Sequence, residues 1–205
     1  GLSIGQCKLS ARQSTFDRIR AMIPTTPRLA PIEQDLWNDE QKELLGKQAV
    51  RGNVPNILKT LIHHEKLARR WLVFAAHILS KSSLTPRDRE IAILRTGWLA
   101  GSRYEWGQHV LIGQDAGLSM EEITSIKDGS QTGAWSRHER YILMACEELH
   151  EKVVLSDETW NGLAETLNSR QMLDLIFTIG QYRMLAGALN SVGVPLDDDI
   201  KHLVD

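Results

Sequence analysis

The pattern of apolar and polar positions along the chain is helical almost throughout. In the segment 65–80, apolar side chains recur at spacings of three and four, which places them on one face of a helix: Leu67, Trp71, Phe74, Ala75 and Ile78. β-Branched residues do not cluster in the alternating pattern that indicates a strand. The sequence therefore predicts an all-α protein with about eight to nine helices joined by short loops.

Capping signals show where most of these helices begin. Thr85 precedes Pro86 and Asp88, which together give an N-cap, a first-turn proline and a first-turn acid. Serine stands three residues before glutamate or threonine at the starts of three further helices: Ser119–Glu122, Ser136–Glu139 and Ser156–Thr159. The helices are expected at 36–48, 55–62, 65–80, 86–100, 104–116, 120–128, 136–152, 156–167 and 169–190.

The N-terminal segment differs from the rest of the chain. Three prolines, Pro24, Pro27 and Pro31, fall within a short stretch and prevent a continuous helix there. We predict that residues 1–35 form a partly irregular arm with a short helix around 15–22, packed on its own domain or wrapped around a neighbouring subunit. Residues 36–205 are predicted to form a single helical domain.

Composition narrows the class of protein. The chain has 205 residues, 42% of them apolar, which suffices for a sizeable core. A net charge of −2 without basic runs argues against nucleic acid as a partner. No apolar run approaches the ~20 residues of a membrane span, so no membrane association is expected. The two cysteines, Cys7 and Cys146, form no CxxC motif, and a reducing cytoplasm is the expected location.

Two acids and one histidine are the candidate catalytic residues. Glu90 lies on or beside the apolar face of its helix, where it could form a salt bridge with Arg87 or another neighbour, be buried with a raised pKa, or be exposed. Glu105 and His109 stand four residues apart on the next helix, so their side chains can touch. They form either an acid/base couple or an ordinary surface pair, and spacing alone favours the surface pair.

Other chemistry is less well supported. Glu90, Glu105 and His109 would also supply three metal ligands, but no HExxH or comparable signature accompanies them, and no metal is predicted. His77 lies within an apolar helix and is interpreted as a core histidine. Ser102 has no GxSxG context, which argues against a nucleophilic serine.

Four runs of residues give the chain a family resemblance. They are Asn53–Asn56 (NVPN), Leu84–Arg95 (LTPRDREIAILR), Tyr104–His109 (YEWGQH) and Ala116–Ser119 (AGLS). Over roughly residues 50–128 the chain resembles the carboxymuconolactone decarboxylase superfamily, which also contains the alkylhydroperoxidase D-type proteins. The resemblance implies an all-α fold of packed helical hairpins that assembles into homo-oligomers, commonly trimers or hexamers.

The resemblance also separates two activities. In the peroxidase branch two cysteines of a CxxC motif react with peroxide, helped by a glutamate and a histidine. Glu90 and His109 match the helpers, but Ser102 and Glu105 stand at the cysteine positions. Neither serine nor glutamate replaces a redox-active thiolate. A peroxidase-like redox role is therefore disfavoured, and a non-catalytic oligomer that binds a small ligand remains a further alternative.

The decarboxylase branch lacks those cysteines and implies a cofactor-independent reaction in aromatic compound catabolism. A carboxylate leaves an unsaturated lactone or related carboxylic acid, and the resulting dienolate is protonated. On this interpretation His109 donates the proton, Glu105 orients it and Glu90 is a second acid/base. The remaining predicted contacts fall into two groups: Arg87 and Arg95 hold a substrate carboxylate, and Trp98, Ser102, Tyr104 and Trp106 shape the pocket.

Overall fold

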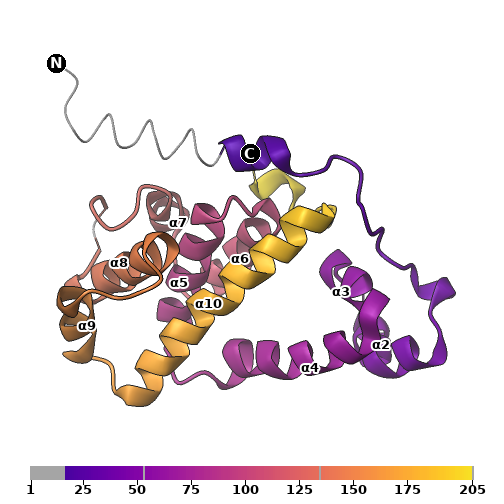
Figure 1. The fold of residues 1–205 in the computed structure, drawn as a ribbon, viewed down its shortest axis with the longest axis horizontal. Helices are drawn as coiled ribbons and strands as arrows, with labels where there is room; N and C mark the ends of the chain where they lie inside the picture. The colour runs from indigo at the N-terminus through magenta and orange to yellow at the C-terminus, as the bar shows by residue number, and fades with distance from the viewer. Residues whose placement is uncertain (1–16, 53, 134, 205) are drawn as a thin grey trace.

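The computed structural model describes residues 17–52, 54–133 and 135–204, which are helical and contain no strand (Figure 1). This confirms the all-α prediction. The longer helices are α2 (Asp39–Arg51), α3 (Asn56–Leu61), α4 (Glu65–Ala76), α5 (Pro86–Leu99), α6 (Arg103–Asp115), α7 (Met120–Ile126), α8 (Arg137–Glu151), α9 (Asp157–Ala164) and α10 (Ser169–Val192). Four short helical segments are η1 (Gln34–Leu36), η2 (Ile62–His64), η3 (His77–Lys81) and η4 (Lys201–Leu203).

Local sequence determines the helix starts largely as expected. The Thr85 side chain accepts a hydrogen bond from the backbone N–H of Asp88 at the start of α5. Full capping boxes form at Ser119 and at Ser136, the N-caps of α7 and α8. Helix α10 is capped by Asn168, one residue before the predicted start, because the Asn168 carboxamide reaches two first-turn N–H groups.

Helix α5 is the centre of the main core. It packs against α6, α8 and α10, which surround it (Figure 1). Four successive residues, Ile91, Ala92, Ile93 and Leu94, are fully buried. A helix enclosed on all sides has no solvent-exposed face, so polar side chains on α5 need hydrogen-bond partners inside the protein.

Helices α2, α3 and α4 pack mainly on one another and have a small core of their own (Figure 1). This core contains Trp37, Leu45, Val54, Ile62 and Ala68. Helix α4 continues into η3, whose Ile78 packs with Ile93 of α5 and Tyr182 of α10. The unit α2–α4 is thereby attached to the main bundle through η3. One face of α4 lies opposite α6 and α10.

Part of the predicted N-terminal arm lies outside the described residues, which begin at residue 17. Residues 17–22 are helical. The Arg28 N–H donates to the carbonyl of Val192 (2.8 Å), and the Arg28 guanidinium donates to the carbonyl of Ser191 (2.9 Å). This part of the arm therefore contacts the C-terminal end of α10. Of the helices described, none is long and apolar enough to cross a membrane.

Candidate functional site

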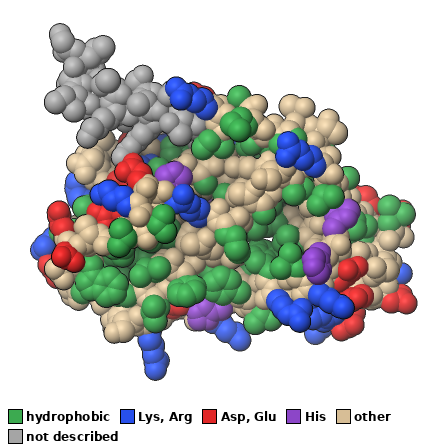
Figure 2. Space-filling view, in the orientation of Figure 1, with side chains coloured by type: hydrophobic (Ala, Val, Ile, Leu, Met, Phe, Trp, Pro, Cys, Tyr) green, Lys and Arg blue, Asp and Glu red, His purple; other side chains and the backbone are tan. Residues whose placement is uncertain are grey.

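A cavity of about 330 Å³ lies between the α2–α4 unit and the main bundle. In Figure 2 hydrophobic side chains surround a hollow on this face of the molecule. Most of the lining is apolar and comes from α3, α4, η3, α6 and α10: Pro55, Ile57, Leu58, Trp71, Leu72, Ala75, Ala76, Ile78, Leu79, Ile112, Leu185 and Leu189. The polar lining residues are Ser80, Tyr104, Glu105, Gln108, His109, Gln181 and Tyr182. Its size suits a small ring-shaped molecule.

Glu90 and His109 form a buried pair beside this cavity. The Nδ1 atom of His109 lies 2.6 Å from Oε2 of Glu90, and Nε of Arg89 donates to Oε1 at 2.8 Å. Burial opposes ionisation of Glu90, but the charges and hydrogen bonds of His109 and Arg89 outweigh it, so the pKa of Glu90 lies below its usual value. The ionised Glu90 holds a hydrogen on Nδ1 and leaves Nε2 of His109 as the nitrogen available to a ligand.

Glu105 is a buried carboxyl group without a hydrogen-bond partner. Its side chain lines the cavity, and neither carboxyl oxygen contacts a donor or acceptor in the part of the chain described. Burial raises the pKa of Glu105 well above its ordinary value. This shift favours the neutral carboxylic acid, which can both donate and accept a hydrogen bond.

The expected contact between Glu105 and His109 does not form. His109 reaches instead to Glu90 on the neighbouring helix α5. The two residues share a helix face, but the carboxylate that pairs with His109 belongs to the neighbouring helix. The interpretation of Glu105 as the group that orients His109 does not fit this geometry, and Glu90 takes that place.

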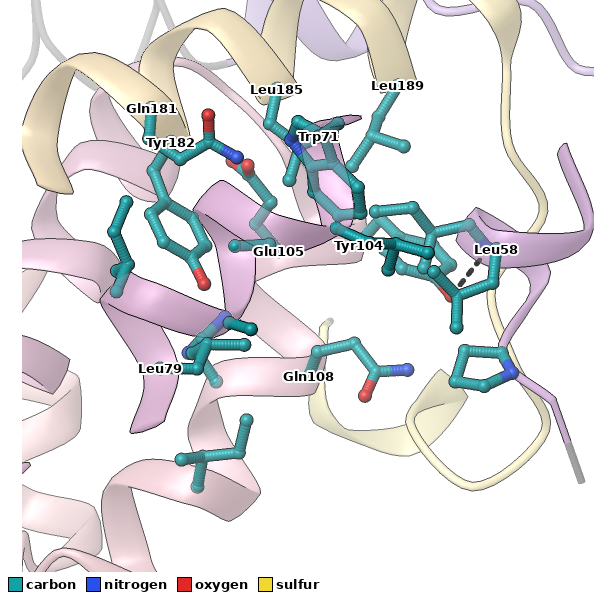
Figure 3. Close-up of a pocket in the computed structure, with 18 of the residues that line it drawn as sticks. Leu58, Trp71, Leu79, Tyr104, Glu105, Gln108, Gln181, Tyr182, Leu185 and Leu189 are labelled. Atoms are coloured by element: carbon teal, nitrogen blue, oxygen red, sulfur yellow. Dashed lines mark hydrogen bonds between the residues drawn. The ribbon is translucent and has the colours of Figure 1, made fainter. Parts of the chain in front are cut away.

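Residues of α4 and α10 complete the site, and sequence reasoning missed them. Tyr182 packs edge-on against the ring of His109, with ring centroids 4.8 Å apart. Gln181 is buried, and its Oε1 has no hydrogen-bond partner within the described chain. The same holds for Nε1 of Trp71. Figure 3 shows Trp71, Glu105 and Gln181 gathered at one end of the cavity.

Tyr104 lies in the cavity wall, as the sequence predicted. Its hydroxyl donates to Asp197 and accepts a hydrogen bond from the backbone N–H of Ile57 (3.1 Å). Asp197 also accepts from Gln108 (2.9 Å) and from the N–H of Asn56 (2.9 Å). Burial and the Asp197 carboxylate raise the pKa of Tyr104, so the phenol stays protonated. These contacts join α3, α6 and the C-terminal segment at the far end of the cavity.

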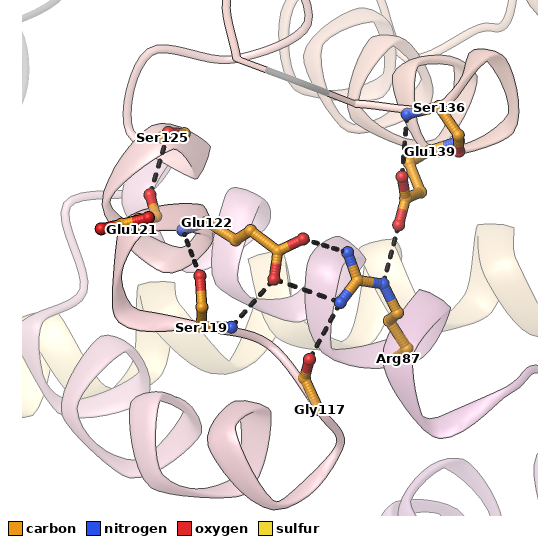
Figure 4. Close-up of polar contacts among 8 residues, drawn as sticks. All are labelled: Arg87, Gly117, Ser119, Glu121, Glu122, Ser125, Ser136 and Glu139. Carbon is orange, nitrogen blue, oxygen red and sulfur yellow. Dashed lines mark hydrogen bonds and ion pairs between the residues drawn. The ribbon is translucent and has the colours of Figure 1, made fainter.

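The two arginines predicted to hold a substrate carboxylate lie elsewhere. Arg87 forms ion pairs with Glu122 and Glu139 and donates to the carbonyl of Gly117, joining α5 to α7 and α8 (Figure 4). Arg95 is fully buried, donates to the carbonyls of Ile126 and Lys127, and pairs with Glu147 at 2.8 Å. Neither lines the cavity, because each is engaged in holding helices together.

The remaining predicted pocket residues also lie away from the cavity lining. Trp98 and Trp106 pack against each other, with ring centroids 5.2 Å apart, and Nζ of Lys127 lies over both rings. Ser102 is the N-cap of α6, where its hydroxyl accepts from the backbone N–H of Glu105. These side chains stabilise the segment that carries Glu105 and do not form its pocket.

The surroundings of His77 differ from those predicted. His77 is not a core histidine: about half of its side chain is exposed, and Nε2 lies 2.7 Å from Asp174. His77 is the first residue of the π-helical turn η3, and its side chain reaches Asp174 of α10. No three His, Cys, Asp or Glu side chains in the described ranges form a group suited to a metal ion.

One family model and several solved structures are similar to this chain. The model of the carboxymuconolactone decarboxylase family matches residues 65–140, which contain Glu90, Glu105 and His109. No curated protein matches the chain in sequence. Among solved structures, an uncharacterized peroxidase-related protein from Ralstonia eutropha JMP134, described as an alkylhydroperoxidase AhpD core, is similar with a TM-score of 0.74 and 17% identity, covering 85% of this chain and 94% of the other.

Two further structures share the fold. A variant of the debrominase Bmp8, solved in complex with 2,3,4-tribromopyrrole, has a TM-score of 0.72 and 12% identity, covering 87% of this chain and 96% of the other. A peroxidase-related protein from Silicibacter sp. TM1040 has a TM-score of 0.70 and 14% identity, covering 87% and 93%. At these identities the likeness establishes an alkylhydroperoxidase D-like fold and no activity.

Proposed function

We propose that this chain, whose residues 65–140 match the carboxymuconolactone decarboxylase family, is a cofactor-independent, decarboxylase-like enzyme. It acts by proton transfer on a small unsaturated lactone or related carboxylic acid. The observation that carries the proposal is Glu105, a neutral buried acid that faces an apolar cavity beside the His109–Glu90 pair.

Glu105 is the proton donor in this proposal, and His109 is not. Decarboxylation breaks the bond between the ring carbon and the carboxylate, and the bonding electrons pass into the unsaturated lactone as CO₂ leaves. The dienolate then takes a proton from the Glu105 carboxyl group at carbon. A buried acid with a raised pKa is protonated before the step and is a suitable donor. After the product leaves, Glu105 regains a proton from solvent, and the free Nε2 of His109, which Glu90 orients, is placed to take up that proton and relay it.

The apolar lining supports decarboxylation in a second way. Among the described residues that line the cavity there is no lysine or arginine. A cation would stabilise the substrate carboxylate, which lowers the free energy of the ground state and raises the barrier to decarboxylation. Apolar walls instead favour the transition state, where the charge is spread over the ring. The arginine contacts predicted from the sequence are thus not needed for this reaction.

A substrate screen with two variants tests the assignment. Carboxylated muconolactones and other unsaturated carboxylic acids are followed by ultraviolet absorbance and by CO₂ release. Glu105→Gln and His109→Gln should each lower kcat by about 100-fold or more, as loss of a positioned acid or base does. Trp135→Phe, which alters a buried indole outside the cavity, should leave turnover unchanged. Full activity in both site variants would refute the roles given to Glu105 and His109.

The peroxidase-like alternative has no thiol at the site within the described residues. Cys146 is buried in the main core, where Sγ lies 3.6 Å from the carbonyl of Ala92. Burial raises the pKa of its thiol to about 12, which disfavours the reactive thiolate. Consumption of peroxide by the purified protein would revive this alternative. A ligand that is bound without being converted, and whose affinity is the same in His109→Gln, would instead support a non-catalytic binding protein.

Self-association is a separate proposal. Exposed apolar side chains follow the outer surfaces of α4 and α10, and they include Val73, Leu173, Phe177 and Met184. Contiguous apolar surface of this kind is typical of subunit interfaces. We propose that the protein forms a homo-oligomer, a trimer or hexamer, which light scattering will measure. A monomeric mass at micromolar concentration would contradict it.

A further inference from the structure

We propose that the cavity recognises a ring whose edge beside Trp71 and Gln181 is uncharged and carries a carbonyl acceptor next to an N–H or O–H donor, and that these two residues determine this specificity. The two residues lie at the same end of the cavity as Glu105 (Figure 3). The inference deepens the proposed function and rests on it in one respect, that this cavity is where the substrate binds.

Three helices supply the polar end of the cavity. Trp71 comes from α4, Glu105 from α6 and Gln181 from α10. Glu105 and Gln181 are 3% and 4% exposed, so water does not satisfy them from the surface. The Nε1 atom of Trp71, Oε1 of Gln181 and both carboxyl oxygens of Glu105 have no hydrogen-bond partner among the described residues.

Buried polar atoms without partners are rare in folded proteins because each one costs free energy. Such atoms also occur elsewhere among the described residues, and Nε1 of Trp135 is one that does not line the cavity. At the polar end, groups from three separate helices meet at one wall of a cavity that is otherwise apolar. This convergence is what a ligand-binding site requires, since the ligand supplies the missing partners.

The chemistry of the three groups specifies the ligand. The indole of Trp71 is only a donor, so it requires an acceptor such as a carbonyl oxygen. Oε1 of Gln181 is only an acceptor and requires an N–H or O–H. The neutral Glu105 fits either group. An anionic group placed against Oε1 of Gln181 would be repelled, which excludes a carboxylate at this position of the ring.

During the proposed reaction the Trp71 contact gains importance. The lactone carbonyl oxygen takes up negative charge as the dienolate forms, and a donor aimed at it stabilises that charge. Trp71 is therefore placed to bind the oxygen that becomes the dienolate oxygen, while Glu105 protonates carbon.

Binding of two unreactive ring compounds tests the proposal without turnover. α-Pyridone carries a carbonyl beside an N–H, whereas α-pyrone has the same shape and carbonyl but no donor. Calorimetry gives the Kd of each. The indole ¹H–¹⁵N signal of Trp71, assigned by its absence in Trp71→Phe, reports where they bind. We expect α-pyridone to bind roughly tenfold more tightly than α-pyrone, the scale of one hydrogen bond to a buried group, and to shift the Trp71 signal.

Variants separate the two contacts. Gln181→Met should abolish the preference for α-pyridone, because the acceptor is gone while the side-chain volume is kept. Trp71→Phe should weaken both compounds by a similar factor of about ten and preserve the preference. Trp135→Phe is the matched control for the indole substitution and should change neither Kd.

The outcomes are distinct from those of the proposed function. Equal binding of the two compounds by the wild-type protein, or equal effects of Trp71→Phe and Trp135→Phe, would overturn the specificity proposal even if a lactone is decarboxylated. Selective binding of α-pyridone that disappears in Gln181→Met would support it even if every carboxylated lactone is left unchanged.

Discussion

The neutral state of Glu105 makes a quantitative prediction about stability. In the unfolded chain a glutamate ionises above about pH 4.3. Burial raises the pKa of Glu105 well above its ordinary value, so the folded protein keeps the proton. The folded state then binds one proton more than the unfolded state. Its free energy of unfolding falls by about 1.4 kcal/mol for each pH unit over the range in which this difference persists.

Glu105→Gln removes this dependence, because a carboxamide of nearly the same shape does not titrate. The difference in unfolding free energy between Glu105→Gln and wild type should therefore move in favour of the variant by about 1.4 kcal/mol per pH unit from about pH 5 up to the folded pKa of Glu105. All other titrating groups are common to both proteins and cancel. Urea unfolding at several pH values, monitored by tryptophan fluorescence, measures the difference.

An exposed glutamate provides the control. Glu40 lies in the first turn of α2 and is solvent-exposed, so the stability difference for Glu40→Gln should change little over the same pH range. A flat pH dependence for Glu105→Gln as well would mean that Glu105 is ionised in the folded protein. The assignment of Glu105 as a neutral proton donor would then be refuted.

Three further predictions concern stability. Arg95→Met breaks the buried pair with Glu147 and should cost about 3–5 kcal/mol in urea unfolding, since one charge is left without its partner; a loss of ligand affinity without loss of stability would contradict its structural role. The hydrogen bond that His138 donates to Asp88 raises the pKa of His138, although burial opposes the shift, so the pair stabilises the protein below about pH 6.5 and this contribution is lost as pH rises through the folded pKa. His138→Gln should therefore cost up to about 1 kcal/mol more at pH 6 than at pH 9, and equal costs would count against the pair. Leu45→Ala truncates a fully buried side chain in the small core of α2–α4 and should cost about 2–5 kcal/mol, with hydrogen exchange rising in α2–α4 before α5; uniform exchange would show a single cooperative core instead.

Local signals were the part of the fold that the sequence predicted well. Helix caps act over three residues, so Ser119 and Ser136 could be identified as N-caps without knowing what the helices contact. Long-range contacts changed other expectations. His77 lies in a largely apolar segment, yet its side chain pairs with Asp174 on α10, which lies 97 residues further along the chain.

The candidate site was predictable only in part. Spacing brought Glu105 and His109 onto one helix face, but it could not show that His109 binds Glu90 on another helix. The family resemblance supplied Glu90 and His109 together, whereas Trp71 and Gln181 carry no motif and meet only through tertiary packing. The sequence signal available was the polar run Gln181, Tyr182 and Arg183, which interrupts the largely apolar middle of α10.

The separate small core of α2–α4 has a consequence for how this protein can diversify. Glu90, Glu105 and His109 are carried by α5 and α6 inside the main bundle, whereas Trp71 is carried by a unit that has its own hydrophobic support. Substitutions on α4 can therefore alter the shape and hydrogen bonding of the cavity while the proton-transfer residues keep their packing. Selection, or an engineer with a library confined to α3 and α4, can change which molecule is accepted without rebuilding the chemistry.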